Sequence, residues 1–166
     1  INIYVSWTPI NKTGVLANSV ANGFYPGWEI DARVPLALYP VVLAEKIAGF
    51  EINEPDEPDI ILNINSNTDW YTGTDGKPET KYDLVTVAMH EICHGLGFFE
   101  SFGVEGSAGG YGLSGIPLVY DTFVENSTGQ KLTNTDLFQN PSSALNTILQ
   151  SRQVYFKGSI VSSPLR

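Results

Sequence analysis

The segment from residue 83 to residue 96, DLVTVAMHEICHGL, constrains the fold more than any other part of the chain. It is long enough for about four helical turns, it begins with an aspartate that can cap a helix, and Gly97 follows where positive φ can turn the chain. His90 and His94 are four residues apart, which stacks their side chains on one face of a helix. We therefore expect a helix over residues 83–96 that presents two imidazoles side by side.

Two imidazoles at this spacing can bind one zinc ion through bonds of about 2.0–2.1 Å. Glu91 follows the first histidine, and from there its carboxylate is expected to reach a zinc-activated water and take its proton as the general base. This is the H-E-x-x-H pattern of metallopeptidases. The motif predicts a zinc-dependent endopeptidase whose substrate is a protein or peptide.

Apolar residues of the same segment share one broad arc at about 100° of rotation per residue. We expect this arc to pack into the core and Cys93 to be an inert core thiol. The residues of the arc are Val85, Ala88, Met89, Ile92, Cys93 and Leu96.

Composition limits the remaining function classes. The chain has 166 residues, of which 42% are hydrophobic, so one domain with a real core is expected. The net charge is −9 and the nine Lys and Arg residues are scattered, which argues against a nucleic-acid partner and against an anionic membrane surface. No apolar run reaches the ~20 residues of a membrane span. We also expect a monomer.

Outside the histidine segment, the pattern predicts a small number of elements. Residues 11–31 are expected to form loop, and Pro40 is expected to kink or start the helix in which it lies. Because strands and helices do not alternate regularly, the predicted class is α+β. Strands are predicted at residues 1–7, 60–65 and 116–124, and helices at residues 34–50 and 142–150.

The phrase HEICHGLG resembles the metzincin pattern H-E-x-x-H-x-x-G-x-x-H/D, with His90, Glu91, His94 and Gly97 in matching positions. The resemblance implies a zincin fold, in which a small mixed sheet packs on a backing helix and an active-site helix. Glu100 stands where metzincins have the third ligand. A carboxylate suits that role, because some zinc sites consist of two histidines and a glutamate.

The wider chain, including PDIILNINSNTDWYTG and PLVYDTFVENSTGQKL, is similar to bacterial secreted metallopeptidases of the leishmanolysin-like type. The resemblance implies secretion and a single catalytic domain over residues 1–166. An N-terminal subdomain would span residues 1–97, and residues 98–166 would form an irregular C-terminal part. In these enzymes a long insertion precedes the third histidine and the Met-turn. Here no His follows His94, so either the chain ends before those elements or a carboxylate replaces the third histidine.

Two carboxylates are candidates for the third ligand. Glu100 has the metzincin spacing, and Asp121 is the second candidate. The alternative interpretation of Glu100 is an ordinary surface residue, and that of Asp121 is a carboxylate at a turn or strand end.

The segment IILNIN resembles the edge strand on which metzincins bind an extended substrate. By this resemblance Ile60, Leu62 and Ile64 would contact the substrate, which would add to the sheet as an antiparallel strand.

Alternatives to the zinc peptidase remain open. A truncated or degenerate zincin would bind metal or peptide without catalysis. Peptide deformylase also carries H-E-x-x-H but needs a cysteine ligand well upstream, and the one cysteine here lies inside the motif. Calcium has no supporting ligand spacing, so the acidic groups are expected to be solvated loops. These groups are Asp56, Glu57 and Asp59, and Asp69 and Asp75.

Overall fold

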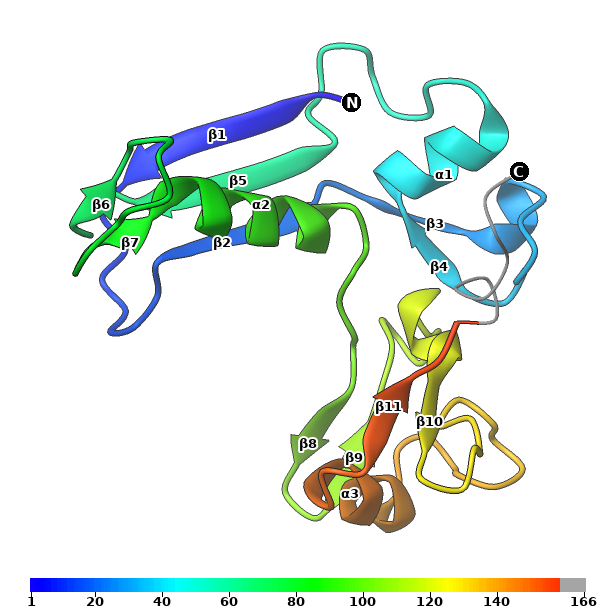
Figure 1. Cartoon of the computed structure of the whole chain (residues 1–166). Coiled ribbons are helices and arrows are strands. Elements are labelled where there is room, and N and C mark those ends of the chain that lie inside the picture. The colour runs from blue at the N-terminus through cyan, green and yellow to red at the C-terminus, as the bar shows by residue number, and fades with distance from the viewer. Residues whose placement is uncertain (159–166) are drawn as a thin grey trace. The chain divides into compact units, whose positions relative to one another are not determined.

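The computed structural model describes residues 1–158, and the chain forms two compact units (Figure 1). The first unit comprises Ile1–Arg33 and Tyr39–Phe99, and the second comprises Val34–Leu38 and the residues from Glu100 onward. Across residues 1–158 the chain combines small β-sheets with three α-helices, which confirms a mixed α and β fold. None of the helices in this range is long and apolar enough to cross a membrane.

The first unit is built on a three-stranded sheet with the order β1-β5-β2. The central strand β5 (Ile60–Asn65) pairs in parallel with β1 (Ile3–Thr8) and antiparallel with β2 (Ala17–Ala21). Both β5 and the N-terminal strand lie where the sequence pattern predicts them. The strand β2 falls within residues 11–31, which were predicted to be loop, and that prediction is wrong in this part.

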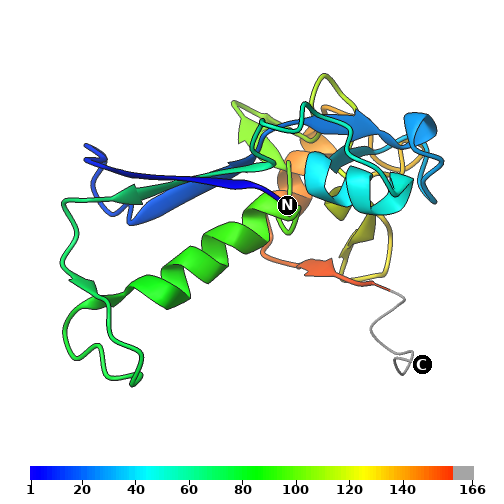
Figure 2. The ribbon, with the colours of Figure 1, turned by 90° about the horizontal axis from the view of Figure 1, so that it is seen from above.

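Helix α2 (Leu84–Gly95) lies along one face of this sheet (Figures 1 and 2). Alternate side chains of β5 point towards the helix and are buried. Each such aliphatic side chain contributes about 1.5–3 kcal/mol by leaving water. The shared core contains Ala17, Leu62, Ile64 and Trp70 of the sheet side and Leu84, Val87, Ala88 and Ile92 of the helix.

The loop that leads into β2 is fixed by the buried side chain of Asn65. Its amide nitrogen donates to the carbonyl of Val15 at 2.9 Å and to that of Ile10 at 3.3 Å, and its oxygen accepts from the backbone N–H of Ile10 at 3.0 Å. The side-chain amide at the end of β5 therefore takes the place of strand-to-strand hydrogen bonds to the loop and sets where β2 begins.

Helix α1 (Val41–Ala48) begins later than the predicted 34–50 range. Pro40 is its N-cap, with φ −60° and ψ 148°, because a proline is tolerated at a helix start but not inside the helix. The residues before it form β4 (Leu38–Pro40), which pairs with β3 (Phe24–Pro26). The short remaining elements of this unit are η1 (Gly27–Glu29), β6 (Trp70–Tyr71) and β7 (Tyr82–Asp83).

The second unit has its own core around α3 (Ser143–Gln150). This helix confirms the predicted 142–150 helix, and its N-cap Ser142 accepts a hydrogen bond from the backbone N–H of Leu145. The core residues are Tyr111, Val124, Leu132, Phe138 and Leu145. The other elements are β8 (Gly103–Glu105), β9 (Ala108–Gly110), η2 (Tyr120–Phe123), β10 (Val124–Asn126) and β11 (Val154–Phe156).

The strand predicted at residues 116–124 is wrong, because most of that segment forms turns and the 3₁₀ helix η2. Asp121 is fully buried there and accepts the backbone N–H of Leu118 at 2.7 Å. A side chain that satisfies the local backbone in this way competes with strand pairing.

Candidate metal centre

Both ends of α2 are specified by local sequence. At the start, Asp83 caps the helix, and its carboxylate accepts the backbone N–H of Thr86 at 2.7 Å. At the end, Gly97 has φ +101°, its N–H donates to the carbonyl of His94, and the N–H of Phe98 donates to that of Cys93, each at 2.9 Å. This pair of bonds is a Schellman motif, which needs a residue that tolerates positive φ.

The two histidines converge as their spacing predicts. Nε2 of His90 lies 2.9 Å from Nε2 of His94, and the ring centroids are 4.5 Å apart. Two nitrogens bound to one tetrahedral zinc at about 2.0–2.1 Å lie about 3.3 Å apart, within a few tenths of an ångström of this separation. The geometry of the pair therefore fits a shared zinc ion.

The other ring nitrogen of His94 fixes its orientation. Nδ1 lies 3.0 Å from the backbone carbonyl oxygen of Phe98. A carbonyl can only accept, so Nδ1 carries the proton, and Nε2 of His94 presents its lone pair, as a metal ligand must. Histidine ligands in proteins almost always donate their second N–H in this way. The same turn that ends the helix thus supplies the carbonyl that orients the imidazole of His94.

Glu91 is on the side of α2 that faces the sheet, and it is only 9% exposed. Its backbone carbonyl accepts a hydrogen bond from the hydroxyl of Ser19 on β2, which ties the helix to that strand. Within residues 1–158 its carboxylate has no hydrogen-bond or ion-pair partner. A largely buried carboxylate without a protein partner is available to accept a proton.

The predicted buried arc of α2 is wrong in several positions. Val85, Met89 and Leu96 are 50%, 63% and 41% exposed, and Cys93 is also exposed, so it is not a core thiol. The helix is apolar on most sides, and the face that packs on the sheet carries Leu84, Val87, Ala88 and Ile92, with Gly95 at its end. At Gly95 an added Cβ would lie only 2.4 Å from Cγ2 of Ile60.

The predicted substrate-contact residues are corrected by the topology. Ile60, Leu62 and Ile64 lie on β5, which has a partner strand on each side and so is not an edge. Their side chains are 0%, 2% and 6% exposed. They form the core beneath α2, and no extended peptide can pair with their strand.

The edge beside α2 belongs to β2, which the sequence did not reveal. The backbone N–H of Asn65 bonds to the carbonyl of Leu16, and that of Asn22 bonds to the carbonyl of Asp59. Since alternate residues of an antiparallel strand face the same neighbour, the even-numbered residues of β2 bond to β5. The backbone groups of Ala17, Ser19 and Ala21 therefore point to the open side.

Both candidates for the third ligand lie in the second unit, whereas the histidine pair lies in the first. Glu100 is exposed. Within the described part of the first unit, no third His, Cys, Asp or Glu atom joins the two imidazole nitrogens. The identity of the third ligand therefore stays a prediction.

Asp121 has a structural task in the second unit. It is fully buried, and its two oxygens accept bonds from Leu118 N–H and from the backbone N–H and hydroxyl of Ser101. Burial raises the pKa of the Asp121 carboxyl, and the charge of Glu100 adds to this, although the bonds from Ser101 and Leu118 oppose it. This network favours the alternative interpretation of Asp121 as a turn carboxylate.

The acidic groups considered for calcium do not form a metal-binding group with one another within residues 1–158. Asp69 pairs with Lys81 at 3.0 Å, and Asp75 accepts a hydrogen bond from the hydroxyl of Tyr71. Asp59 belongs to a group of carboxylates with Glu45 and Glu51. The sequence did not indicate this group, because α1 and the following loop bring its members together.

Comparison with known proteins gives a family but no activity. Residues 36–148, which is more than half of the chain and includes α2, match the SPBPB7E8-like family. The fission yeast Schizosaccharomyces pombe (strain 972 / ATCC 24843) has a relative, "Uncharacterized protein PB7E8.01", that is 29% identical over 96 residues. The match covers 56% of this chain but only 17% of that protein. No solved structure matches. By the extent of the first match, the chain belongs to the SPBPB7E8-like family.

Proposed function

We propose that this chain is the catalytic core, or the N-terminal part of one, of a zinc-dependent endopeptidase with a metzincin-like fold. The observation that carries the proposal is the pair of Nε2 atoms 2.9 Å apart, with the proton of His94 held on Nδ1 by the carbonyl of Phe98. Secretion is part of the same proposal and rests on the resemblance to leishmanolysin-like enzymes. The match covers only 17% of the length of the yeast relative, so an activity of a whole protein of that length is a proposal as well.

Each residue has a distinct task in this proposal. His90 and His94 would hold the metal through Nε2. When bound, zinc lowers the pKa of water towards ~7 and polarises the carbonyl of the scissile peptide bond. Glu91 accepts the proton of the attacking water at its carboxylate and returns it to the nitrogen of the leaving amine. Its low exposure keeps bulk water away from that proton.

The open side of β2 is the proposed position for an extended substrate. Ala17, Ser19 and Ala21 offer backbone donors and acceptors there, and Ser19 is bonded to the helix at Glu91. A peptide paired with this edge would extend the sheet on the side where α2 packs. Main-chain pairing would give affinity for extended segments with little dependence on side chains.

Zinc content and casein digestion by three variants test the proposal. Glu91→Gln should bind zinc like the wild type and lose about 10²–10⁴-fold in hydrolysis rate, because only the proton acceptor is removed. His94→Ala should lose zinc, because one of the two imidazoles is gone. Glu105→Gln, an exposed carboxylate on β8, is the matched control and should change neither property.

The second candidate is a degenerate zincin that binds metal without catalysis, and the absence of a third ligand atom from the described part of the first unit favours it. Zinc that binds to the wild type without any casein digestion would support that candidate. A wild-type protein that binds no zinc at all, after incubation with excess zinc, would refute both.

A further inference from the structure

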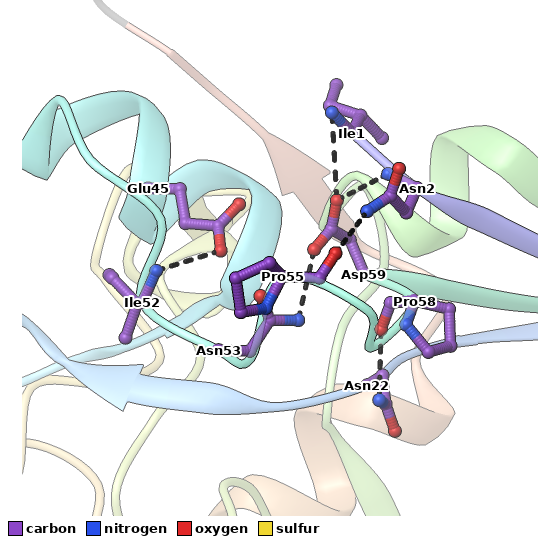
Figure 3. Close-up of polar contacts among 9 residues, drawn as sticks. All are labelled: Ile1, Asn2, Asn22, Glu45, Ile52, Asn53, Pro55, Pro58 and Asp59. Carbon is purple, nitrogen blue, oxygen red and sulfur yellow. Dashed lines mark hydrogen bonds and ion pairs between the residues drawn. The ribbon is translucent and has the colours of Figure 1, made fainter.

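Three carboxylates converge in the first unit around the loop between α1 and β5. Two of them, those of Glu45 and Asp59, are shown in Figure 3. Glu45 lies on α1, Glu51 follows that helix, and Asp59 directly precedes β5. One oxygen from each lies within 4.8 Å of the others. Oxygens bound to one Ca²⁺ at about 2.4 Å cannot be more than about 4.8 Å apart, so the three fit a single coordination shell.

A buried amide oxygen without a hydrogen-bond donor belongs to the side chain next to this group. The side-chain nitrogen of Asn53 donates to Oδ1 of Asp59 at 3.1 Å, which fixes the amide beside that carboxylate. In the view of Figure 3 the amide lies between the carboxylates of Glu45 and Asp59. The Asn53 oxygen is buried, and no residue among 1–158 donates a hydrogen bond to it. A buried oxygen without a donor costs free energy, and a bound cation would remove that cost.

The charge of the group is not balanced by side chains. Within the described residues, neither Glu45 nor Glu51 forms an ion pair, although Glu45 accepts the backbone N–H of Ile52 at 3.1 Å. The other oxygen of Asp59 accepts the backbone N–H of Asn2 at 2.7 Å and lies 3.8 Å from the amino group of Ile1. Three carboxylates this close repel one another unless a cation lies between them.

We propose that Glu45, Glu51, Asp59 and the amide oxygen of Asn53 form a binding site for Ca²⁺. All four donors are oxygens, which suits calcium and not zinc. Calcium suits four protein oxygens better than Mg²⁺ does, because Mg²⁺ keeps several of its waters and usually binds through only one or two carboxylates. The site is separate from the histidine pair and does not depend on the proposed peptidase function.

A cation here would stabilise the part of the sheet that supports α2. Asp59 directly precedes Ile60, and the side chain of Ile60 fills the space over Gly95 at the end of the helix. Calcium would tie the loop after α1 to this point. The binding free energy would therefore add to the stability of the strand under the histidine helix.

Calorimetric titration of calcium-free protein with CaCl₂ tests the site, with a matched pair of variants on the same loop. Glu51→Gln and Glu57→Gln each remove one exposed carboxylate charge, but only Glu51 belongs to the group. We expect one Ca²⁺ per chain with Kd of about 10⁻⁴–10⁻³ M for the wild type. Glu51→Gln should weaken binding at least tenfold, whereas Glu57→Gln should stay within about twofold of the wild type.

Two further measurements separate this site from others. Asn53→Ala should also weaken calcium binding, and His94→Ala should leave it unchanged. The proposal is overturned if the wild type gives no saturable binding below about 10 mM CaCl₂, or if MgCl₂ binds as tightly. It is also overturned if Glu51→Gln and Glu57→Gln weaken binding equally, since that result would reflect net charge alone.

Discussion

Gly97 is a residue on which both the fold of the first unit and the candidate metal centre depend. A Cβ at this residue would lie 2.6 Å from Cγ of Pro40, and the backbone has φ +101°. The residue also ends α2 so that the carbonyl of Phe98 reaches Nδ1 of His94. We expect Gly97→Ala to destabilise the first unit and to weaken zinc binding.

The size of the effect follows from these contacts. Alanine in the left-handed region costs about 1–2 kcal/mol, and forcing a methyl into occupied space costs about 1–3 kcal/mol. Reduced freedom of the unfolded chain returns about 0.4–1 kcal/mol, which leaves a net loss of about 2–4 kcal/mol. Gly49, the C-cap of α1, has φ +79° and no atom within 4 Å of an added Cβ. Gly49→Ala should therefore cost about 1 kcal/mol or less, because only the backbone strain remains.

Urea unfolding followed by tryptophan fluorescence measures this difference. All three tryptophans, Trp7, Trp28 and Trp70, belong to the first unit, so the signal reports that unit alone. Zinc affinity, measured by competition with a chelating dye, should fall about 10–100-fold in Gly97→Ala, because the support of His94 is lost. Equal stability of the two alanine variants would refute the steric argument. A destabilised Gly97→Ala variant with unchanged zinc affinity would refute the role of the Phe98 carbonyl.

Three other predictions follow from burial. Leu62→Ala should lower the free energy of unfolding by about 2–5 kcal/mol, because Leu62 is core and not substrate-contacting, whereas Val20→Ala at a 48% exposed position should have little effect. Asp121→Asn should lose about 1–3 kcal/mol in urea unfolding followed by circular dichroism, because one backbone N–H would face the amide. Burial raises the folded-state pKa of Asp121, so the stability that its carboxyl contributes is complete below the unfolded pKa of 3.8 and is lost as pH rises through the folded value. The difference in free energy of unfolding between the wild type and Asp121→Asn should therefore shrink with rising pH. Cys93 should react with a thiol reagent in the native protein without denaturant; protection until unfolding would contradict its exposure.

The features that the sequence predicts correctly are local ones. The helix over residues 84–95, its Asp83 cap and the turn at Gly97 depend on residues within one or two turns of each other. The convergence of His90 and His94 follows from the helical period alone. Such features need no knowledge of which distant segments meet, so a single sequence is sufficient for them.

The errors concern contacts between distant segments. Strand β5 has the predicted bounds, yet its place in the sheet depends on β2, whose residues ANSVA carry little strand character. The anchor that positions β2 is the Asn65 amide, a polar contact that hydrophobic periodicity does not register. The prediction of the buried face of α2 is wrong for a similar reason. On a helix that is apolar on most sides, the elements that pack against it determine which face is buried.

The end of α2 explains why the orientation of His94 does not depend on the residue at position 100. The spacing from His94 to Gly97 places Phe98 one turn beyond the histidine, where its carbonyl can accept from Nδ1. In this chain the glycine of the motif therefore orients the second imidazole, whatever residue stands at position 100. A substitution of the third ligand leaves that turn intact, because both bonds of the Schellman motif join backbone atoms of residues 93–98. The departure from the metzincin pattern at Glu100 thus bears on how the proposed coordination shell would be completed and leaves the convergence of the two histidines unchanged.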